Sequence, residues 1–224
     1  MTMASQPGLR QLTTPRAAAL AGVVFALLFG AVLILIRTKM PEGVQGSTEW
    51  LTSRRSGIAT ATVLMPFAGI SFLWFIGVVR DGLGRYEDRF FSTVFLGSGL
   101  LFLAMMFVSM SVAAGLVATN TGVTDPAADA EMIDLGKMVV LSSTKTYAVR
   151  MAAVFMMSLA TIWLRTGLMP RWLVGLSYLA AVALLLASDL SMWVTMTFPG
   201  WVLVVSGLLL VRAGLFEELR AGDH

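Results

Sequence analysis

The residues that are best suited to chemistry lie in one polar stretch, at positions 142 to 150, and at a single acid further along the chain. The stretch reads Ser-Ser-Thr-Lys-Thr-Tyr-Ala-Val-Arg inside an otherwise apolar segment. Lys145, Tyr147 and Arg150 supply two cations and a phenol, and Asp189 supplies a carboxylate. Two cations and one acid favour the binding of an anionic ligand such as a lipid headgroup or a carboxylate. The sequence predicts that these four side chains line a ligand-binding pocket open to the outer face of a membrane.

The same residues support a second interpretation, in which they are structural. Arg150 lies 14 residues from Leu164 and Asp189 lies 17 residues from Trp172, which is roughly 21 Å and roughly 26 Å at helical rise. Similar depths on neighbouring helices favour an Arg150–Asp189 pair, with Tyr147 one turn from Arg150, because an unpaired charge inside a bilayer is costly. Such a pair holds two helices together without any ligand. Both interpretations remain open at this stage.

Catalytic and metal chemistry find little support in the composition. The chain has no Cys, and its one His is His224. Thiolate and bis-His metal sites are therefore excluded for this chain alone, and a hydrolase would depend on Ser142 or Ser143 with Lys145. The net charge of +3 is small, and most basic residues stand at the ends of apolar segments. We expect a non-enzymatic protein with no catalytic residues, no metal, no cofactor and no nucleic acid partner.

The elements that would position these residues are membrane helices. Of the 224 residues, 57% are hydrophobic and only 13% are charged, about half the charged share of an ordinary soluble domain. Uncharged runs of about 20 residues are long enough to cross a hydrocarbon core. The sequence predicts an all-α, polytopic membrane helix bundle between a cytoplasmic segment (1–16) and a cytoplasmic tail (217–224). The transmembrane domain (17–216) has six expected spans, at about 17–36, 57–79, 90–117, 138–164, 172–189 and 199–215.

The distribution of Lys and Arg predicts the orientation. With the N-terminus inside, nine basic residues fall in cytoplasmic segments and six fall outside, which favours both termini in the cytoplasm. Tryptophan prefers the two interfaces, and this topology puts Trp163 and Trp172 at the inner boundary and Trp50, Trp193 and Trp201 near the outer one. Arg outnumbers Lys thirteen to three. This bias indicates a high-GC bacterium, and hence the bacterial cytoplasmic membrane.

Two segments outside the spans are expected to be helical. Residues 47–51 look like the start of a short interfacial helix, with Ser47 as its cap. Asp125 can cap a second helix that begins at Pro126, since proline suits the first helical position. This second helix is expected to lead, through a bend near Gly136, into the fourth span.

Small residues recur at every fourth position of the first span, at Ala18, Gly22, Ala26 and Gly30. Small side chains allow another helix backbone to approach closely. The stripe fits packing against another span of the same chain. It also fits docking of another membrane protein subunit or a second copy.

Two prolines mark candidate hinges. Pro66 lies in the middle of the second span, where it removes one backbone hydrogen bond and favours a kink, and the hydroxyls of Thr62 or Ser71 are candidates to satisfy the freed backbone. Such a kink serves either as a hinge or as static geometry. Pro199, followed by Gly200, is the expected start of the last helix after a tight turn.

The residues 74–81 (Trp-Phe-Ile-Gly-Val-Val-Arg-Asp) and 87–91 (Glu-Asp-Arg-Phe-Phe) resemble those of small uncharacterised multi-pass membrane proteins of actinobacteria. This resemblance covers the second and third spans and implies no activity. The residues themselves support two functional hypotheses. The first is an accessory or scaffold subunit of a membrane assembly, acting through helix packing in the lipid bilayer. The alternative is a small transporter, or a protein that binds lipid or anions at the polar cluster.

Overall fold

The structure is a computed structural model that describes residues 14–40, 49–83, 89–118, 126–187 and 192–221. Within these ranges the secondary structure is helical and contains no strand, so the all-α prediction is confirmed. The elements in chain order are α1 (Thr14–Lys39), α2 (Glu49–Leu83), α3 (Arg89–Ala118), α4 (Pro126–Ser142), the π-helix η2 (Ser143–Ala148), α5 (Val149–Thr166), α6 (Arg171–Ala187), the 3₁₀-helix η3 (Met192–Met196) and α7 (Thr197–Ala221).

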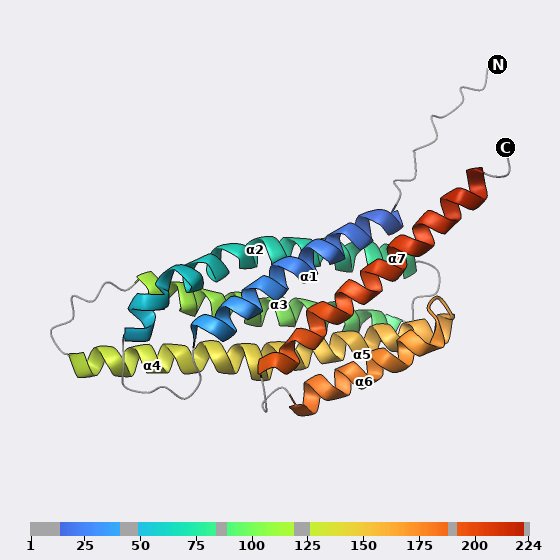
Figure 1. Ribbon diagram of the computed structural model, residues 1–224. Coiled ribbons are helices and arrows are strands. Elements are labelled where there is room, and N and C mark those ends of the chain that lie inside the picture. The colour runs from blue at the N-terminus through green and yellow to red at the C-terminus, as the bar shows by residue number, and fades with distance from the viewer. Residues whose placement is uncertain (1–13, 41–48, 84–88, 119–125, 188–191, 222–224) are drawn as a thin grey trace, which may run out of the picture.

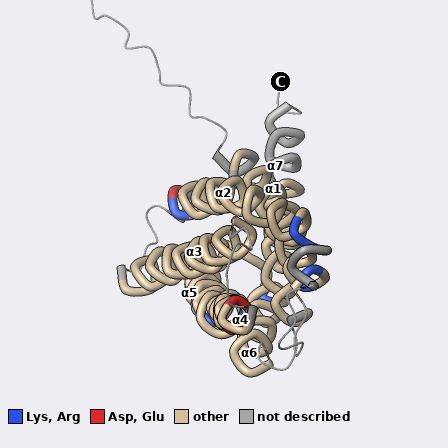
Figure 2. The backbone as a smooth tube through the Cα atoms, turned by 90° about the vertical axis from the view of Figure 1, so that its left-hand side faces the viewer, with Lys and Arg blue, Asp and Glu red and all other residues tan. Residues whose placement is uncertain are grey.

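The helices form a bundle in which successive rods run in opposite directions (Figure 1). The first turn of α1 and the last turn of α7 lie at the same end. Helix α1 packs against α2 and α7, and α3 packs against both α2 and the α4–η2–α5 rod. Helix α6 contacts α5. Figure 2 shows that charged residues occupy few places along these rods, as expected where the surroundings are apolar.

In the described part of the chain, five helical segments are long and apolar enough to cross a membrane, which suggests a multi-pass membrane protein. Their candidate spans are Ala19–Lys39, Arg54–Asp81, Phe90–Ala118, Ala127–Thr166 and Trp193–Val211. The predicted fifth span, 172–189, corresponds to α6, which has 17 residues and is shorter than the others. The general prediction of membrane helices therefore holds. Helix α6, however, is only about 25 Å long at helical rise.

The fourth predicted span is longer than expected. A helix begins at Pro126, as predicted, but continues through Gly136 and η2 to Thr166 without interruption, and its apolar part alone has 40 residues. At Gly136 the side chain of Leu116 occupies the space that a Cβ would need. The glycine therefore serves close packing of α3 on α4 and does not end the helix. The expected short helix near 47–51 is likewise the beginning of α2, which starts at Glu49.

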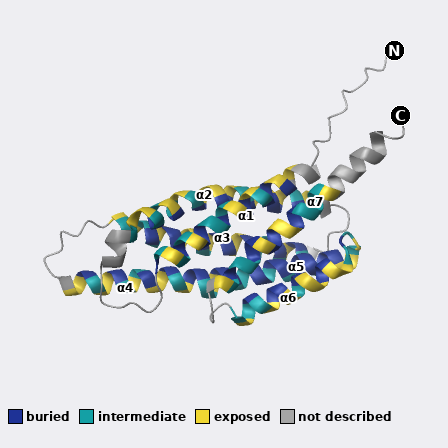
Figure 3. Ribbon diagram, in the orientation of Figure 1, coloured by how far each residue is buried: buried dark blue, intermediate teal, exposed yellow. Residues whose placement is uncertain are grey.

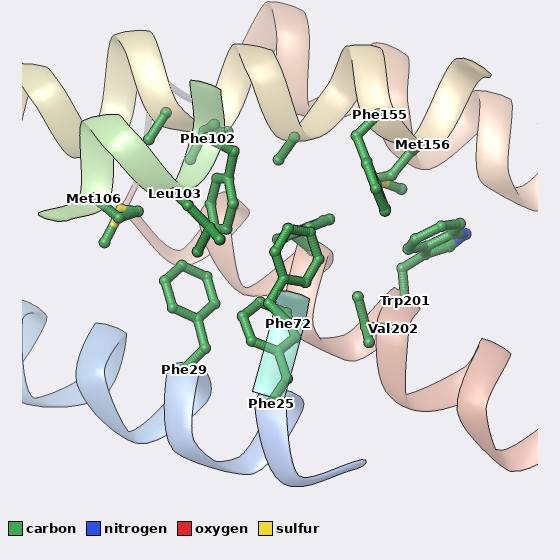
Figure 4. Close-up of a cluster of buried hydrophobic side chains, with 14 of the residues drawn as sticks. Phe25, Phe29, Phe72, Phe102, Leu103, Met106, Phe155, Met156, Trp201 and Val202 are labelled. Atoms are coloured by element: carbon green, nitrogen blue, oxygen red, sulfur yellow. The ribbon is translucent and has the colours of Figure 1, made fainter. Parts of the chain in front are cut away.

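Aromatic side chains fill the middle of the bundle. Helix α1 contributes Phe25 and Phe29, and their rings stack at a centroid distance of 5.2 Å. Phe72 of α2 lies 4.6 Å from Phe25 and 5.3 Å from Phe102 of α3. We call the following buried side chains the aromatic core: Phe25, Phe29, Phe72, Phe102, Phe155, Phe198 and Trp201 (Figure 4). Figure 3 shows buried residues along the inward faces of the same helices and exposed ones outside.

The connection between α5 and α6 is a tight turn. Gly167 has a φ of 68°, and its N–H donates to the Trp163 carbonyl at 2.9 Å, which ends α5. This left-handed conformation favours glycine. Pro170 then immediately precedes α6, and its carbonyl accepts the Leu173 N–H at 3.0 Å. The short turn makes α5 and α6 antiparallel neighbours.

Candidate functional site

The polar stretch of the sequence forms the π-helix η2. The Val149 N–H donates to the Thr144 carbonyl, five residues back instead of four. The fully buried hydroxyls of Thr144 and Ser109 (α3) lie 2.8 Å apart, and Ser109 donates to the Val140 carbonyl at 3.0 Å. Because Ser109 has one proton to give, Thr144 is the donor of the pair. A π-helical turn is rare and is frequently found at functional sites.

The predicted site residues around η2 point in different directions. Arg150 is half-buried, and its Nη1 donates to the Thr146 carbonyl at 3.4 Å. Lys145 is also half-buried, whereas Tyr147 is 58% exposed and faces the outside of the bundle. Asp189 lies outside the described residues. The structure therefore places two cations on partly covered faces of the rod and turns the phenol away from the bundle.

Arg150 lies near the middle of the apolar length of the bundle. Two contacts between α3 and the rod bracket its depth: Ser109 meets Thr144, and the rings of Phe95 and Phe155 stack at 4.5 Å. Interpolating between them puts Arg150 about level with Leu101 of α3. The apolar run of α3 extends from Phe90 to Ala118, so this level is well inside it. An ionised guanidinium at such a depth is costly unless water or counter-charge accompanies it.

Helix α6 ends at about the same level. Thr161 and Tyr178 share a hydrogen bond of 2.7 Å between their hydroxyls, which fixes the register of α5 against α6. Arg150 is 11 residues before Thr161, close to three full turns, and therefore on the same face of α5. Ala187, the last residue of α6, is nine residues after Tyr178. The end of α6 therefore approaches the level of Arg150, part-way along the α4–η2–α5 rod (Figure 1).

Two tryptophans pack inside the bundle beside α6. Trp163 and Trp201 were expected at opposite membrane boundaries, and this expectation is wrong, because both are buried with ring centroids 6.0 Å apart. The Trp201 Nε1–H donates to the Ser177 hydroxyl of α6 at 2.7 Å. The first residues of α7 are also buried in the bundle, since Phe198 is 1% exposed and its ring lies 6.1 Å from that of Phe155. The ring of Trp193, just before α7, lies 6.0 Å from the Arg37 guanidinium.

The small residues of α1 do not stay on one face. Gly22 is buried where Phe75 of α2 and Ser206 of α7 occupy the space of its missing side chain, and Ala26 is also buried. Around Gly30, by contrast, a Cβ would meet nothing within 4 Å. A four-residue spacing drifts by about 40° per step on a helix of 3.6 residues per turn. The stripe therefore begins in the bundle at Gly22 and turns outward at Gly30, and the side chain of Ala18 lies outside the described residues.

Neither candidate hinge interrupts its helix. Helix α2 continues through Pro66. The hydroxyls proposed to satisfy the freed backbone bind elsewhere: Thr62 donates to the Ala59 carbonyl at 2.8 Å and Ser71 to the Phe67 carbonyl at 2.9 Å. The last helix was expected to start at Pro199, but α7 starts two residues earlier, at Thr197. Pro199 is therefore its third residue. Both prolines are parts of continuous helices here.

Sequence reasoning missed an unusual face of α4. Two of its charged residues, Asp129 and Lys137, are buried, at 8% and 5% exposure, whereas the apolar Leu135 and Met138 are exposed at 63% and 64%. The sequence did not show this, because periodicity alone does not say which face of a helix turns inward. This burial pattern reverses that of a helix surrounded by water.

Among the described residues no three His, Cys, Asp or Glu side chains come together to hold a metal ion. The candidate groups lie in two places along the rod: hydroxyls and cations at and beside η2, and the Asp129 carboxylate on α4. No protein family model, curated protein or solved structure matches the chain. The function must therefore be argued from these groups.

Proposed function

We propose that the chain has six membrane segments in a bacterial cytoplasmic membrane, with both ends of the chain on the cytoplasmic side. The common end of α1 and α7 supports an even number of passages. The excess of Arg and Lys, nine against six, supports the orientation. In this arrangement α6 and α7 enter from the cytoplasmic side as a pair. Helix α6 ends near the level of Arg150, short of the outer boundary.

The function that the geometry supports best is the binding of small anions from the outer side, as in a small transporter. The observation that carries it is the place of Arg150: a half-buried guanidinium in the middle of the apolar length, next to a π-helix and near the end of α6. Lys145 adds a second cation one to two turns away. Charges inside a membrane usually face a water-filled space or a partner, and two cations concentrate anions there.

The absence of cysteine from the chain allows a clean test by single-cysteine labelling. Thr146→Cys, between the two cations, is treated from outside with membrane-impermeant methanethiosulfonates that carry either a sulfonate or a trimethylammonium group. We expect modification, with the anionic reagent about tenfold faster because the cations attract it. In the Arg150→Gln background this preference is expected to fall while the thiol still reacts.

Leu101→Cys is the matched control, since Leu101 lies level with Arg150 but is exposed on the outside of the bundle. A thiol in lipid does not ionise, so this variant should stay unmodified. An unreactive Thr146→Cys, or equal rates for the two reagents, would contradict the anion site. Chloride flux into proteoliposomes, measured for wild type and Arg150→Ala, then separates transport from binding: loss of flux in a folded variant supports a transporter.

The second candidate is an accessory or scaffold subunit that associates through α1. Gly30 favours it, because the open space at its Cβ leaves the α1 backbone accessible. Gly22 and Ala26 do not add to this surface, since they pack inside the bundle. Association of two differently tagged copies, compared between wild type and Gly30→Leu, tests self-association through this surface, and unchanged association would count against it.

A further inference from the structure

A groove separates α3 from α4 near the end of the apolar run of α3. Its volume is about 390 Å³, within the range of roughly 300–1,000 Å³ that is usual for ligand pockets. A Cβ at Gly115 would meet nothing within 4 Å, so the missing side chain keeps the groove open. Its walls are almost entirely apolar, and the residues that line it are Val112, Gly115, Leu116, Asp129, Met132, Ile133, Leu135, Gly136 and Val139.

Asp129 is the one charged residue in this wall. It is only 8% exposed, and no hydrogen bond or ion pair of its carboxylate joins it to another residue in the described part of the chain. The next acid of the helix, Asp134, differs, because its Oδ1 lies 3.8 Å from Lys137 Nζ. A carboxylate among apolar side chains carries a desolvation cost that a bound cation would offset.

The groove opens toward whatever surrounds the bundle. Met132 and Leu135 line it and are more than half exposed, so the outer rim is apolar. At the contact of Leu116 with Gly136 the groove is close to Ala118, where the apolar run of α3 ends. A bound molecule would therefore contact apolar side chains along most of the groove and one negative charge, that of Asp129. This combination matches an amphiphile that carries an ammonium group.

We propose that the groove binds an amphiphile that carries an ammonium group, with its tail against the α3 and α4 walls and its ammonium donating to the Asp129 carboxylate. Two sources share this chemistry: the amine headgroup of a phospholipid and a free long-chain amine. The site is separate from Lys145 and Arg150 and does not depend on the anion site.

The test uses the full chain in nanodiscs and native mass spectrometry. The probes are phosphatidylethanolamine, phosphatidylglycerol as the anionic counterpart, and dodecylamine. We expect the wild type to retain an amine probe about tenfold better than phosphatidylglycerol, since a charge-assisted hydrogen bond accounts for a difference of that size. Retention of the phospholipid identifies the bilayer as the source, and retention of dodecylamine alone identifies a free amine.

Three variants separate this site from nonspecific lipid binding. Asp129→Asn keeps the shape and removes the charge, so the preference for amines should disappear. Asp134→Asn is the matched control on the same helix and should leave that preference unchanged. Gly115→Leu fills the groove and should reduce retention of every amine probe; its folding is checked by thermal unfolding. Equal retention of amine and anionic probes by the wild type, or an unchanged preference in Asp129→Asn, would overturn the proposal.

Discussion

The α5 part of the long rod and its α4–η2 part pack against their neighbours in different ways. Along α5, Phe155 contacts rings from three other helices, among them Phe72 at 5.2 Å and Phe95 at 4.5 Å. Along α4 and η2 the buried groups include hydroxyls and charges, such as Thr144 and Asp129, and a groove remains open. Ring packing dominates one region of the bundle, whereas the other buries polar groups beside an open groove.

The largest effect that tests this contrast is expected in the aromatic core. Phe72 lies within 6.3 Å of five other rings and is fully buried. Phe72→Ala should lower the free energy of unfolding by about 3–5 kcal/mol, because it leaves a cavity among side chains that cannot close around it. Thermal unfolding in detergent measures the effect.

Phe67→Ala is the matched control in the same helix, since Phe67 is 57% exposed and loses few protein contacts. It should cost less than about 1 kcal/mol. Similar losses for Phe67→Ala and Phe72→Ala would mean that the aromatic core does not hold the bundle together.

A second, smaller effect is expected where α1, α2 and α7 meet. A Cβ on Gly22 would overlap the Ser206 hydroxyl and come within 2.8 Å of the Phe75 ring. Gly22→Ala should therefore destabilise the bundle by about 1–3 kcal/mol through overpacking. Ser206→Ala removes the overlapping oxygen, whose hydroxyl is buried without a hydrogen-bond partner among the described residues, and should restore part of the loss.

Gly30→Ala supplies the control for this prediction. A methyl group there meets nothing within 4 Å, and alanine favours a helix interior over glycine by roughly 0.5–1 kcal/mol. Guanidinium or thermal unfolding should show no loss of stability. A destabilised Gly30→Ala together with a neutral Gly22→Ala would reverse the inward and outward assignment of these two glycines.

The sequence predicts the helices well because the length of each apolar run can be read directly from the residues. It predicts their pairing less well, since pairing depends on side chains from distant segments. Nothing local to Thr144 shows that Ser109, 35 residues earlier, shares its hydrogen bond. Likewise, nothing local to Trp201 shows that its indole N–H donates to Ser177, 24 residues earlier. The same difference applies to the candidate site. The sequence shows the polar stretch at 142–150, but it does not show that Asp129 is buried.

The smallest predicted effect concerns the polar contact between α3 and η2. Ser109→Ala and Thr144→Val each remove one hydroxyl of the 2.8 Å pair while keeping most of the side-chain volume. A double-mutant cycle on thermal unfolding should give a coupling of about 0.6 kcal/mol, the usual size for hydroxyl pairs between membrane helices. Such a value lies well below the expected loss for Phe72→Ala. A coupling of about 3 kcal/mol would instead make the polar region as important for stability as the aromatic core. The main role of η2 would then be to stabilise the fold.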